Sequence, residues 1–304
     1  MAGTFPATSR VSAPPLQFGL TFVRHGESLG NKLGVVQGQK DYPLSTLGLS
    51  EAQQLGQNSV QNLRVSHVFS SDLSRSLKTA EIVCSFLGHS PPIIIDQRLR
   101  ERNFGTLEGL ARDQFRVELR KAGCHMNEFK PPGGESDADL RLRAAAFLED
   151  LFKSIRLFER ERQQAVTNGT PDYFTEYQVP SGKSLVVAPA NEVLTASILI
   201  FSHGGWIKEA LIYLEMQYKF CVEAHRVMLK NVAPNCGIST FTVKLQEPKV
   251  TLSCLWMHKI YHESDNAGDR TRRALQMNRS ISSPARSLRA SNSSANRQLS
   301  SVNN

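Results

Sequence analysis

The chain has 304 residues, of which 40% are hydrophobic, and it carries a formal net charge of +8. This length is enough for one sizeable hydrophobic core. No apolar run approaches the roughly 20 residues that a membrane-spanning helix needs. No basic stretch is interleaved with aromatic residues, as is typical of nucleic-acid-binding surfaces. We therefore expect neither a membrane nor a nucleic acid as a partner.

The five cysteines are widely spaced and odd in number, and they form no Cys-x-x-Cys pair. This pattern favours reduced thiols over disulfides or a zinc site, and it predicts a cytoplasmic protein. Residues 1–16 are rich in Ser, Thr, Pro and Ala and have no apolar segment like that of a secretory signal. We expect them to be disordered. A single arginine and no acid in this stretch leave a conditional association with mitochondria open.

The folded body is predicted between residues 17 and 262. It opens with the apolar, β-prone run 18–23, which we expect to form a buried strand. After it we expect a helix over 51–62 capped by Ser50, a strand over 65–69, a helix over 73–87 capped by Asp72, and a strand over 93–95.

The Pro-Pro-Gly-Gly stretch at 131–134 predicts a loop. Apolar residues recur at helical spacing after it and predict an amphipathic helix that ends at about Phe158. Residues 159–192 are polar and poorly periodic, and they predict a surface insertion. The elements expected after this insertion are a strand over 197–201, a helix over 206–216, and a hairpin of strands over 237–245 and 250–257.

Strands that alternate with helices predict an α/β fold with three αβα layers and a mostly parallel central sheet. The tail, residues 263–304, is rich in Arg, Ser and Asn, and we expect it to be disordered. Arg279 stands three residues before Ser282, a spacing typical of phosphoserine sites that 14-3-3 proteins bind. Such matches are common in Ser/Arg-rich segments, so chance is the favoured interpretation and Ser282 stays a candidate phosphosite.

Two strand-to-helix corners each present a histidine. Arg24-His25-Gly26-Glu27 follows the first strand, and Ser202-His203-Gly204-Gly205 follows the strand over 197–201. Open α/β sheets bind their ligands at the carboxyl ends of such strands. A neutral imidazole can attack phosphorus, so the pair of corners predicts phosphoryl transfer with a histidine nucleophile.

Phosphoryl transfer also needs positive charge around the phosphate and a proton for the leaving oxygen. Arg24 and Arg75 offer the charge, because a guanidinium binds phosphate through two parallel hydrogen bonds. Glu101 offers the proton. It stands between Arg100 and Arg102, and the sequence leaves open whether these arginines point at its carboxylate. Since arginines and histidines already supply positive charge, we expect no metal and no other cofactor.

Several segments resemble the histidine phosphatase superfamily, in which phosphoglycerate mutases and fructose-2,6-bisphosphatases share one type of site. The resemblance runs in the same order over roughly residues 18 to 260, without the insertion and the tails. Its segments are Leu20–Ser28, Val36–Gln39, Phe69–Leu73, Arg98–Arg102, Phe129–Glu135 and Val232–Gly237.

The resemblance implies that His25 becomes a phosphohistidine, that Glu101 protonates the leaving group, and that His203 stabilises the transferring phosphoryl group. Two departures from the family pattern bear on the choice of substrate: Phe104 replaces a tyrosine, and Gly30 replaces a larger aromatic residue. The residues that the resemblance assigns to phosphate or substrate binding are Arg24, Arg75, Asn31, Gln37, Gly38 and Gly204.

The activity that the resemblance implies is a metal-independent phosphatase acting on a small phosphorylated metabolite. Fructose 2,6-bisphosphate is the first expected substrate, and its conversion to fructose 6-phosphate would lower glycolytic flux. Three alternatives stay open: 2,3-bisphosphoglycerate or another phosphocarboxylate as substrate, a transferase of the phosphoglycerate mutase type, and a non-catalytic scaffold acting through its tail. The intact His25, Glu101 and His203 argue against the scaffold.

Overall fold

The computed structural model describes residues 16–60, 63, 65–88, 91–170, 196–221, 223–246 and 249–260. The first 15 residues, the tail with Ser282 and most of the predicted insertion lie outside the described residues, so the predictions made for them stay predictions. Leu16, which we assigned to the disordered segment, already belongs to the first strand. Among the described residues, no helix is long and apolar enough to cross a membrane.

The sheet has six strands in the order β3-β2-β4-β1-β5-β6. Four neighbouring strands, from β3 to β1, are parallel to one another, while β5 and β6 continue the sheet as an antiparallel hairpin. The predicted mostly parallel sheet and its hairpin are therefore confirmed. The strands are β1 (Leu16–Arg24), β2 (Val65–Ser70), β3 (Ile93–Ile95), β4 (Ala196–Ser202), β5 (Ile238–Gln246) and β6 (Lys249–Lys259).

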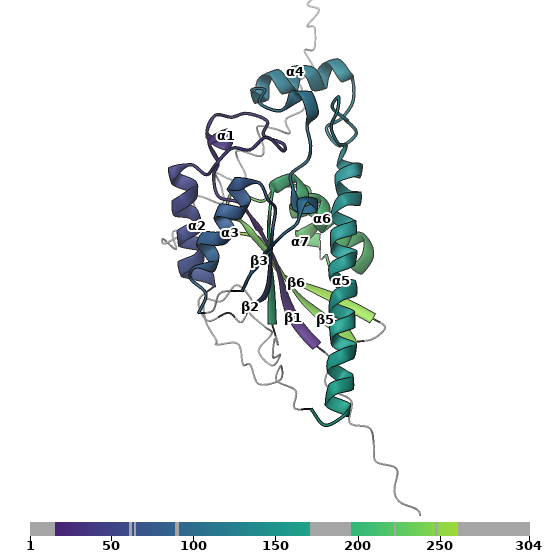
Figure 1. Ribbon diagram of the computed structural model, residues 1–304. Helices are drawn as coiled ribbons and strands as arrows, with labels where there is room; N and C mark the ends of the chain where they lie inside the picture. Colours follow the sequence, from purple (N-terminus) through teal and green to yellow (C-terminus); the bar gives the residue numbers. More distant parts are fainter. Residues whose placement is uncertain are drawn as a thin grey trace, which may run out of the picture. The chain divides into compact units, whose positions relative to one another are not determined.

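Helices cover both faces of this sheet, with α2 and α3 on one face and α5 and α6 on the other (Figure 1). The central strand β4 shows why both faces are covered. Its Ile198 and Ile200 pack in the core beneath α5 and α6, whereas Leu199 and Phe201 pack in the core beneath α2 and α3. A strand that is apolar on both sides needs a helix layer on each side. The three layers that we predicted are confirmed.

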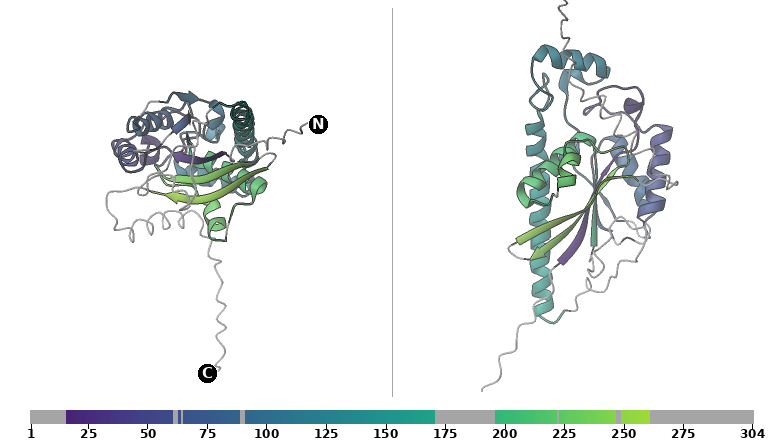
Figure 2. Two further views of the ribbon diagram at one scale, coloured as in Figure 1. Left: turned by 90° about the horizontal axis from the view of Figure 1, so that it is seen from below. Right: turned by 180° about the vertical axis from the view of Figure 1, so that it is seen from behind.

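A smaller cluster of apolar side chains forms beyond the carboxyl ends of the parallel strands, where α1 and α4 lie (Figures 1 and 2). The α-helices are α1 (Leu29–Lys32), α2 (Thr46–Ser59), α3 (Ser74–Cys84), α4 (Arg112–Ala122), α5 (Asp137–Thr167), α6 (Gly204–Tyr218) and α7 (Glu223–Leu229), and the 3-10 turns are η1 (Gln97–Leu99) and η2 (Gly105–Leu107).

Two predicted helix starts are wrong. Helix α2 begins after Ser45, not after Ser50, and the Ser45 hydroxyl accepts a hydrogen bond from the Gly48 amide at 3.1 Å. The same hydroxyl donates to Glu27 at 2.7 Å, a partner 18 residues away that no local pattern reveals. Helix α3 begins at Ser74, and Asp72 does not cap it, because its carboxylate pairs with Arg100 instead.

The long helix α5 does not end at about Phe158 but continues to Thr167. The predicted insertion therefore starts too early, and its first nine residues are helical. In this last part of the helix, Glu159 and Arg162 lie one turn apart and are buried as an ion pair at 2.8 Å. Charged residues in a sequence favour a surface assignment, and nothing in the local pattern shows that this pair is buried.

Candidate active site

The register of the sheet brings the two histidine corners together. Strands β1 and β4 are parallel neighbours in which Arg24 pairs with Ser202, so His25 and His203 are the next residues on adjacent strands. The His25 amide donates to the Ser202 carbonyl at 3.1 Å. The two imidazole rings lie 5.2 Å apart, centre to centre, and both are buried. The structure thus places both histidines at one edge of the sheet.

The imidazole of His25 has one nitrogen held by the backbone. Its Nδ1 lies 2.7 Å from the carbonyl oxygen of Gly26. Since a carbonyl only accepts hydrogen bonds, Nδ1 carries the proton and Nε2 keeps its lone pair. Burial, followed by the charges of Arg75 and Arg24, holds the pKa of His25 well below its ordinary value of 6.5. The ring is therefore neutral at pH 7, the state a nucleophile requires.

His203 is held from the opposite side. Its Nε2 lies 2.9 Å from the hydroxyl of Ser71, which follows the end of β2. Its Nδ1 is buried and has no hydrogen-bond partner among the described residues. Burial first, and then the charge of Arg75, lower the pKa of His203 well below 6.5. We did not foresee Ser71, although its position at a strand end beside β4 is the signal that could have identified it.

The two arginines expected to bind phosphate are both fixed by backbone carbonyls. Arg24 donates from Nη1 to the Ala233 carbonyl at 2.5 Å, and Arg75 donates from Nη2 to the Gly38 carbonyl at 2.8 Å. In each side chain Nε is buried without a hydrogen-bond partner among the described residues. Burial lowers the pKa of Arg75 to about 10, so it stays charged at pH 7. Two positive charges of this kind, Arg75 buried and Arg24 partly buried, favour an anionic ligand.

Glu101 lies at the start of α6, where backbone amides point at its carboxylate. Oε2 accepts from the Gly205 amide at 3.0 Å, and Oε1 accepts from the Trp206 amide at 3.1 Å. A Cβ on Gly205 would overlap this carboxylate, so a side chain at this position would displace it. Burial lowers the pKa of both Arg24 and Arg75, and the negative charge of Glu101 offsets part of this lowering, so Glu101 lies within their electrostatic reach.

The arginines on either side of Glu101 do not point at its carboxylate. Arg100 pairs with Asp72 at 2.5 Å, and Arg102 pairs with Asp137 at 2.5 Å. This settles the question that the sequence left open. Each flanking guanidinium is engaged by a carboxylate of its own.

Two of the predicted substrate-binding residues, Asn31 and Gln37, lie together around Ser28. The Ser28 hydroxyl is 2.9 Å from Oδ1 of Asn31 and 2.5 Å from Oε1 of Gln37. Gly30 packs against the Gln37 side chain, and a Cβ at this position would overlap it. Phe104 is the other departure from the family pattern. Its ring makes an edge-to-face contact with the ring of Phe115 in the small apolar cluster near α4.

The two predicted glycines adjoin the arginines. Gly38 has a positive φ of 55° and accepts a hydrogen bond from Arg75 through its carbonyl. Gly204 has no room for a side chain, since a Cβ there would overlap Val232 and come close to Nε of Arg24. Both glycines therefore lie beside an arginine that we expect to bind phosphate.

Sequence reasoning missed two further residues that fix the His25 corner. The Gly26 amide donates to the Thr79 hydroxyl at 3.1 Å, and Asn235 donates from Nδ2 to the His25 carbonyl at 3.1 Å. Thr79 lies one helical turn after Arg75, which places it on the same face of α3. Within the described parts of the chain, no group of three or more His, Cys, Asp or Glu residues could hold a metal ion.

A family model described as the histidine phosphatase superfamily (branch 1) matches residues 20–166. The chain is 33% identical over 276 residues to the fructose-2,6-bisphosphatase TIGAR of Xenopus tropicalis, an alignment that covers 83% of this chain and 97% of that protein. It is 32% identical over 260 residues to the protein of the same name from Mus musculus, covering 81% and 96%.

This chain belongs to the histidine phosphatase superfamily. The resemblance that we saw in its motifs is thereby confirmed, and so is the expected class of enzyme, a phosphatase. The chain is also similar to the probable phosphoglycerate mutase GpmB of Erwinia tasmaniensis, with 38% identity over 151 residues, covering 48% of this chain and 67% of that protein.

Solved structures agree on the fold. The structure described as mycobacterial hydrolase 2 matches with a TM-score of 0.57 and 20% identity, covering 86% of this chain and 97% of its own. Mycobacterial hydrolase 1 matches with a TM-score of 0.55 and 22% identity, covering 80% and 99%. The predicted three-layer histidine phosphatase fold is confirmed.

Proposed function

We propose that this protein removes a phosphate group from a small phosphorylated metabolite through a phosphohistidine at His25, with fructose 2,6-bisphosphate as the first candidate substrate. One observation carries the proposal. The Gly26 carbonyl holds Nδ1 of His25, which leaves a neutral Nε2 as the attacking atom beside Arg24, Arg75 and His203. The choice of substrate rests on the relatives named fructose-2,6-bisphosphatase, about a third identical over most of the chain.

In the first step, Nε2 of His25 attacks phosphorus and the bond from phosphorus to the sugar oxygen breaks. The electron pair of that bond goes to the leaving oxygen, which takes a proton from the carboxyl group of Glu101. Arg24, Arg75 and His203 would bind the non-bridging oxygens, where negative charge is greatest in the transition state. The negative charge of a bound phosphate favours the protonated form of a neighbouring carboxyl group.

In the second step, water attacks the phosphohistidine. The Glu101 carboxylate takes one proton from that water, the bond from nitrogen to phosphorus breaks, and inorganic phosphate leaves. His25 returns to its neutral form and Glu101 to its protonated form, so the cycle closes with the hydrolysis of one phosphate ester. Asn31 on α1 and Gln37, next to the Gly38 carbonyl that Arg75 binds, would contact the rest of the substrate, because they lie together around Ser28.

A mutase is the second candidate, since about half of the chain, 48%, aligns with a probable phosphoglycerate mutase. A mutase would pass the phosphoryl group from His25 to a second acceptor, and a phosphatase passes it to water. A phosphatase releases inorganic phosphate steadily in the absence of any acceptor other than water. Phosphate release therefore separates the two candidates.

The experiment is phosphate release by the full chain from fructose 2,6-bisphosphate, 2,3-bisphosphoglycerate, phosphoglycolate and phosphoenolpyruvate, with a chelator present. We expect His25→Ala to abolish release and to prevent labelling of the protein by radioactive phosphate in a base-stable, acid-labile form. The exposed His67 gives a matched control, and His67→Ala should keep full activity. If wild type releases phosphate from none of these compounds, or if His25→Ala keeps its activity, the proposal fails.

We also propose a cytoplasmic location. The described cysteines, Cys84, Cys124, Cys221, Cys236 and Cys254, are all free thiols. Free thiols that stay reduced are typical of the cytosol. Fractionation of cells that produce the full chain tests this location. Recovery of the protein in the mitochondrial fraction of unstressed cells would contradict it.

A further inference from the structure

Glu101 lies on a segment without regular secondary structure. Residues 100–104 connect the turns η1 and η2, and within this segment no strand or helix bonds fix the backbone of residues 101–103. The carbonyl groups of this segment therefore need partners from elsewhere in the chain. A carboxyl group that must reach a leaving oxygen also needs its backbone held within a fraction of an ångström. The question is which residue holds it.

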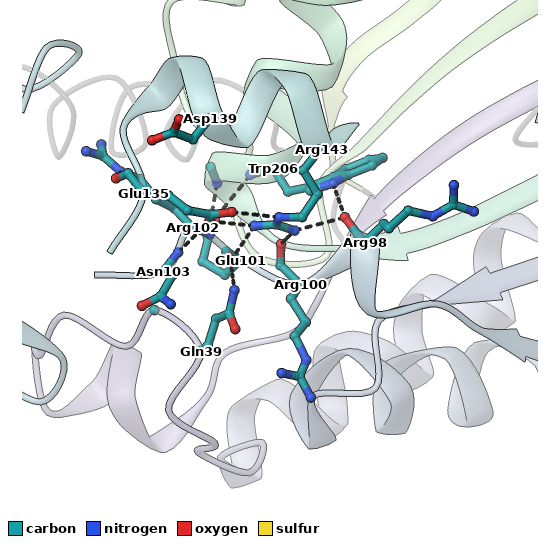
Figure 3. Close-up of polar contacts among 12 residues, drawn as sticks. Gln39, Arg98, Arg100, Glu101, Arg102, Asn103, Glu135, Asp139, Arg143 and Trp206 are labelled. Carbon is teal, nitrogen blue, oxygen red and sulfur yellow. Dashed lines mark hydrogen bonds and ion pairs between the residues drawn. The ribbon is translucent and has the colours of Figure 1, made fainter. Parts of the chain in front are cut away.

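The guanidinium of Arg143, from helix α5, is that partner (Figure 3). Nη1 donates to the carbonyls of Arg98 at 2.9 Å and Arg100 at 2.7 Å, and Nη2 donates to the carbonyl of Glu101 itself at 3.0 Å. One side chain therefore binds three backbone carbonyls on the approach to the proposed acid. Arg143 contacts the backbone of Glu101 and not its carboxylate.

Glu135 holds the other side of Arg143 and of the segment. Nε and Nη2 of Arg143 donate to the two carboxylate oxygens of Glu135 at 2.8 and 2.7 Å. The same carboxylate accepts from the Asn103 amide at 2.8 Å, and the Glu135 amide donates to the Asn103 carbonyl at 2.8 Å. Arg143 and Glu135 thus form one pair that grips the chain both before and after Glu101 (Figure 3).

The indole of Trp206 completes the arrangement from α6. Its Nε1 donates to the Arg98 carbonyl at 2.7 Å, while its backbone amide donates to the Glu101 carboxylate. Trp206 is fully buried. Two helices therefore hold the segment. Arg143 from α5 binds its backbone, and Trp206 from α6 binds both its backbone and the carboxylate of Glu101.

We propose that Arg143 is a positioning residue for the proton transfer by Glu101. It holds the backbone of residues 98–101 so that the Glu101 carboxyl group lies at the leaving oxygen, and it touches no substrate atom. The proposal rests on the proposed function, in which Glu101 protonates the leaving group. Lysine cannot replace this arginine, because an ammonium has no planar fork to serve three carbonyls and a two-pronged carboxylate together.

The test compares two substrates that differ in their need for a proton. The sugar oxygen of fructose 2,6-bisphosphate leaves only when protonated, while 2,4-dinitrophenolate leaves 2,4-dinitrophenyl phosphate without a proton. Formation of phosphohistidine is measured in a single turnover with each. We expect Arg143→Lys to slow the reaction of the sugar bisphosphate by about 10²-fold, and to leave that of the aryl phosphate almost unchanged.

Arg141→Lys is the matched control. Arg141 lies on the same helix and binds the buried Glu209 with two nitrogens, at 2.9 and 2.7 Å, but contacts nothing in residues 98–103. Its loss weakens a comparable ion pair, and we expect the ratio of the two substrate rates to stay at the wild-type value. Equal slowing of both substrates by Arg143→Lys would show a merely structural role and would overturn the proposal.

A double variant makes the test specific to Glu101. If Arg143 acts only through Glu101, adding Arg143→Lys to Glu101→Gln should slow the sugar bisphosphate no further than Glu101→Gln alone. A further loss of tenfold or more would refute the proposal. Failure of the proposed function looks different. There, Glu101→Gln itself would fail to discriminate between the two substrates, or His25→Ala would stay active.

Discussion

The two halves of the active site are built in different ways. The sheet positions the half that contains the two histidines, since His25 and His203 follow paired residues of the neighbouring strands β1 and β4. Side chains position the half that contains Glu101, because Glu101 lies on an irregular segment. Arg143, Glu135 and Trp206 hold this segment in place. Backbone ladders fix the first half through many weak bonds, whereas single substitutions can release the second.

The largest expected effects concern two buried arginines, one in each half. Arg75 is buried without a carboxylate partner among the described residues, so we expect Arg75→Met to lower kcat by about 10²–10³-fold. Arg102 is paired with the buried Asp137, so we expect Arg102→Met to lower the free energy of unfolding by about 3 kcal/mol. Steady-state kinetics and urea denaturation of both variants check this. An equal loss of stability in Arg75→Met and Arg102→Met would contradict the different roles that we assign to the two arginines.

The adjacent glycines at the start of α6 give a sharper contrast. A Cβ on Gly204 would overlap Val232 and come close to Nε of Arg24, while a Cβ on Gly205 would overlap the Glu101 carboxylate. We expect Gly205→Ala to slow the sugar bisphosphate by about 10²-fold and to spare 2,4-dinitrophenyl phosphate. Gly204→Ala should slow both substrates alike, because both need the phosphate clamp. Identical substrate profiles for the two variants would contradict the assignment of Glu101 as the acid.

The histidine half should also contribute to the pH dependence of stability, together with His258, whose pKa burial lowers to about 4. His25 and His203 have pKa values held well below 6.5 in the folded protein, so below pH 6.5 the unfolded chain takes up protons that the folded chain does not. The free energy of unfolding should then fall as the pH drops from 6.5 towards 5, by up to about 1.4 kcal/mol per pH unit for each histidine.

Urea denaturation between pH 7.5 and 5 measures this slope. His25→Asn should reduce it by the share of one histidine, and the exposed His67→Asn should leave it unchanged. An unchanged slope in His25→Asn would mean that this imidazole takes up its proton in the folded state, contrary to its burial.

The smallest effect is expected at Gln39, whose Nε2 donates to the Glu101 carbonyl at 3.2 Å. This single neutral hydrogen bond is only partly buried, so we expect Gln39→Ala to cost less than about 1 kcal/mol of stability. The substrate ratio should move in the same direction as for Arg143→Lys, but by far less. A loss as large as that of Arg143→Lys would show that Arg143 is not the main support of the segment.

The half with the two histidines was easier to predict from the sequence than the half with Glu101, because strands leave a local pattern and distant side-chain contacts do not. Runs such as 197–201 are apolar throughout, and a histidine that follows one is placed by the strand itself. By contrast, Arg143 is 42 positions from Glu101, and nothing around either residue indicates that they meet. Ser45 and Ser50 are equally acceptable as helix caps, and only the distant contact of Ser45 with Glu27 decides between them. The end of α5 was mispredicted for a similar reason, because the charges of Glu159 and Arg162 favoured a surface segment although the two residues form a buried ion pair.

The strand order has a consequence for how the protein comes into being on the ribosome. Strand β4 lies between β2 and β1, yet it follows them by more than a hundred residues. Until Ala196–Ser202 has emerged, β1 and β2 lack the strand that joins them, and both keep unpaired edges. Non-local pairing of this kind is slow and exposes folding intermediates to aggregation. His25 and His203 are therefore brought together late in synthesis, and a chain interrupted before residue 203 holds the proposed nucleophile without its partner.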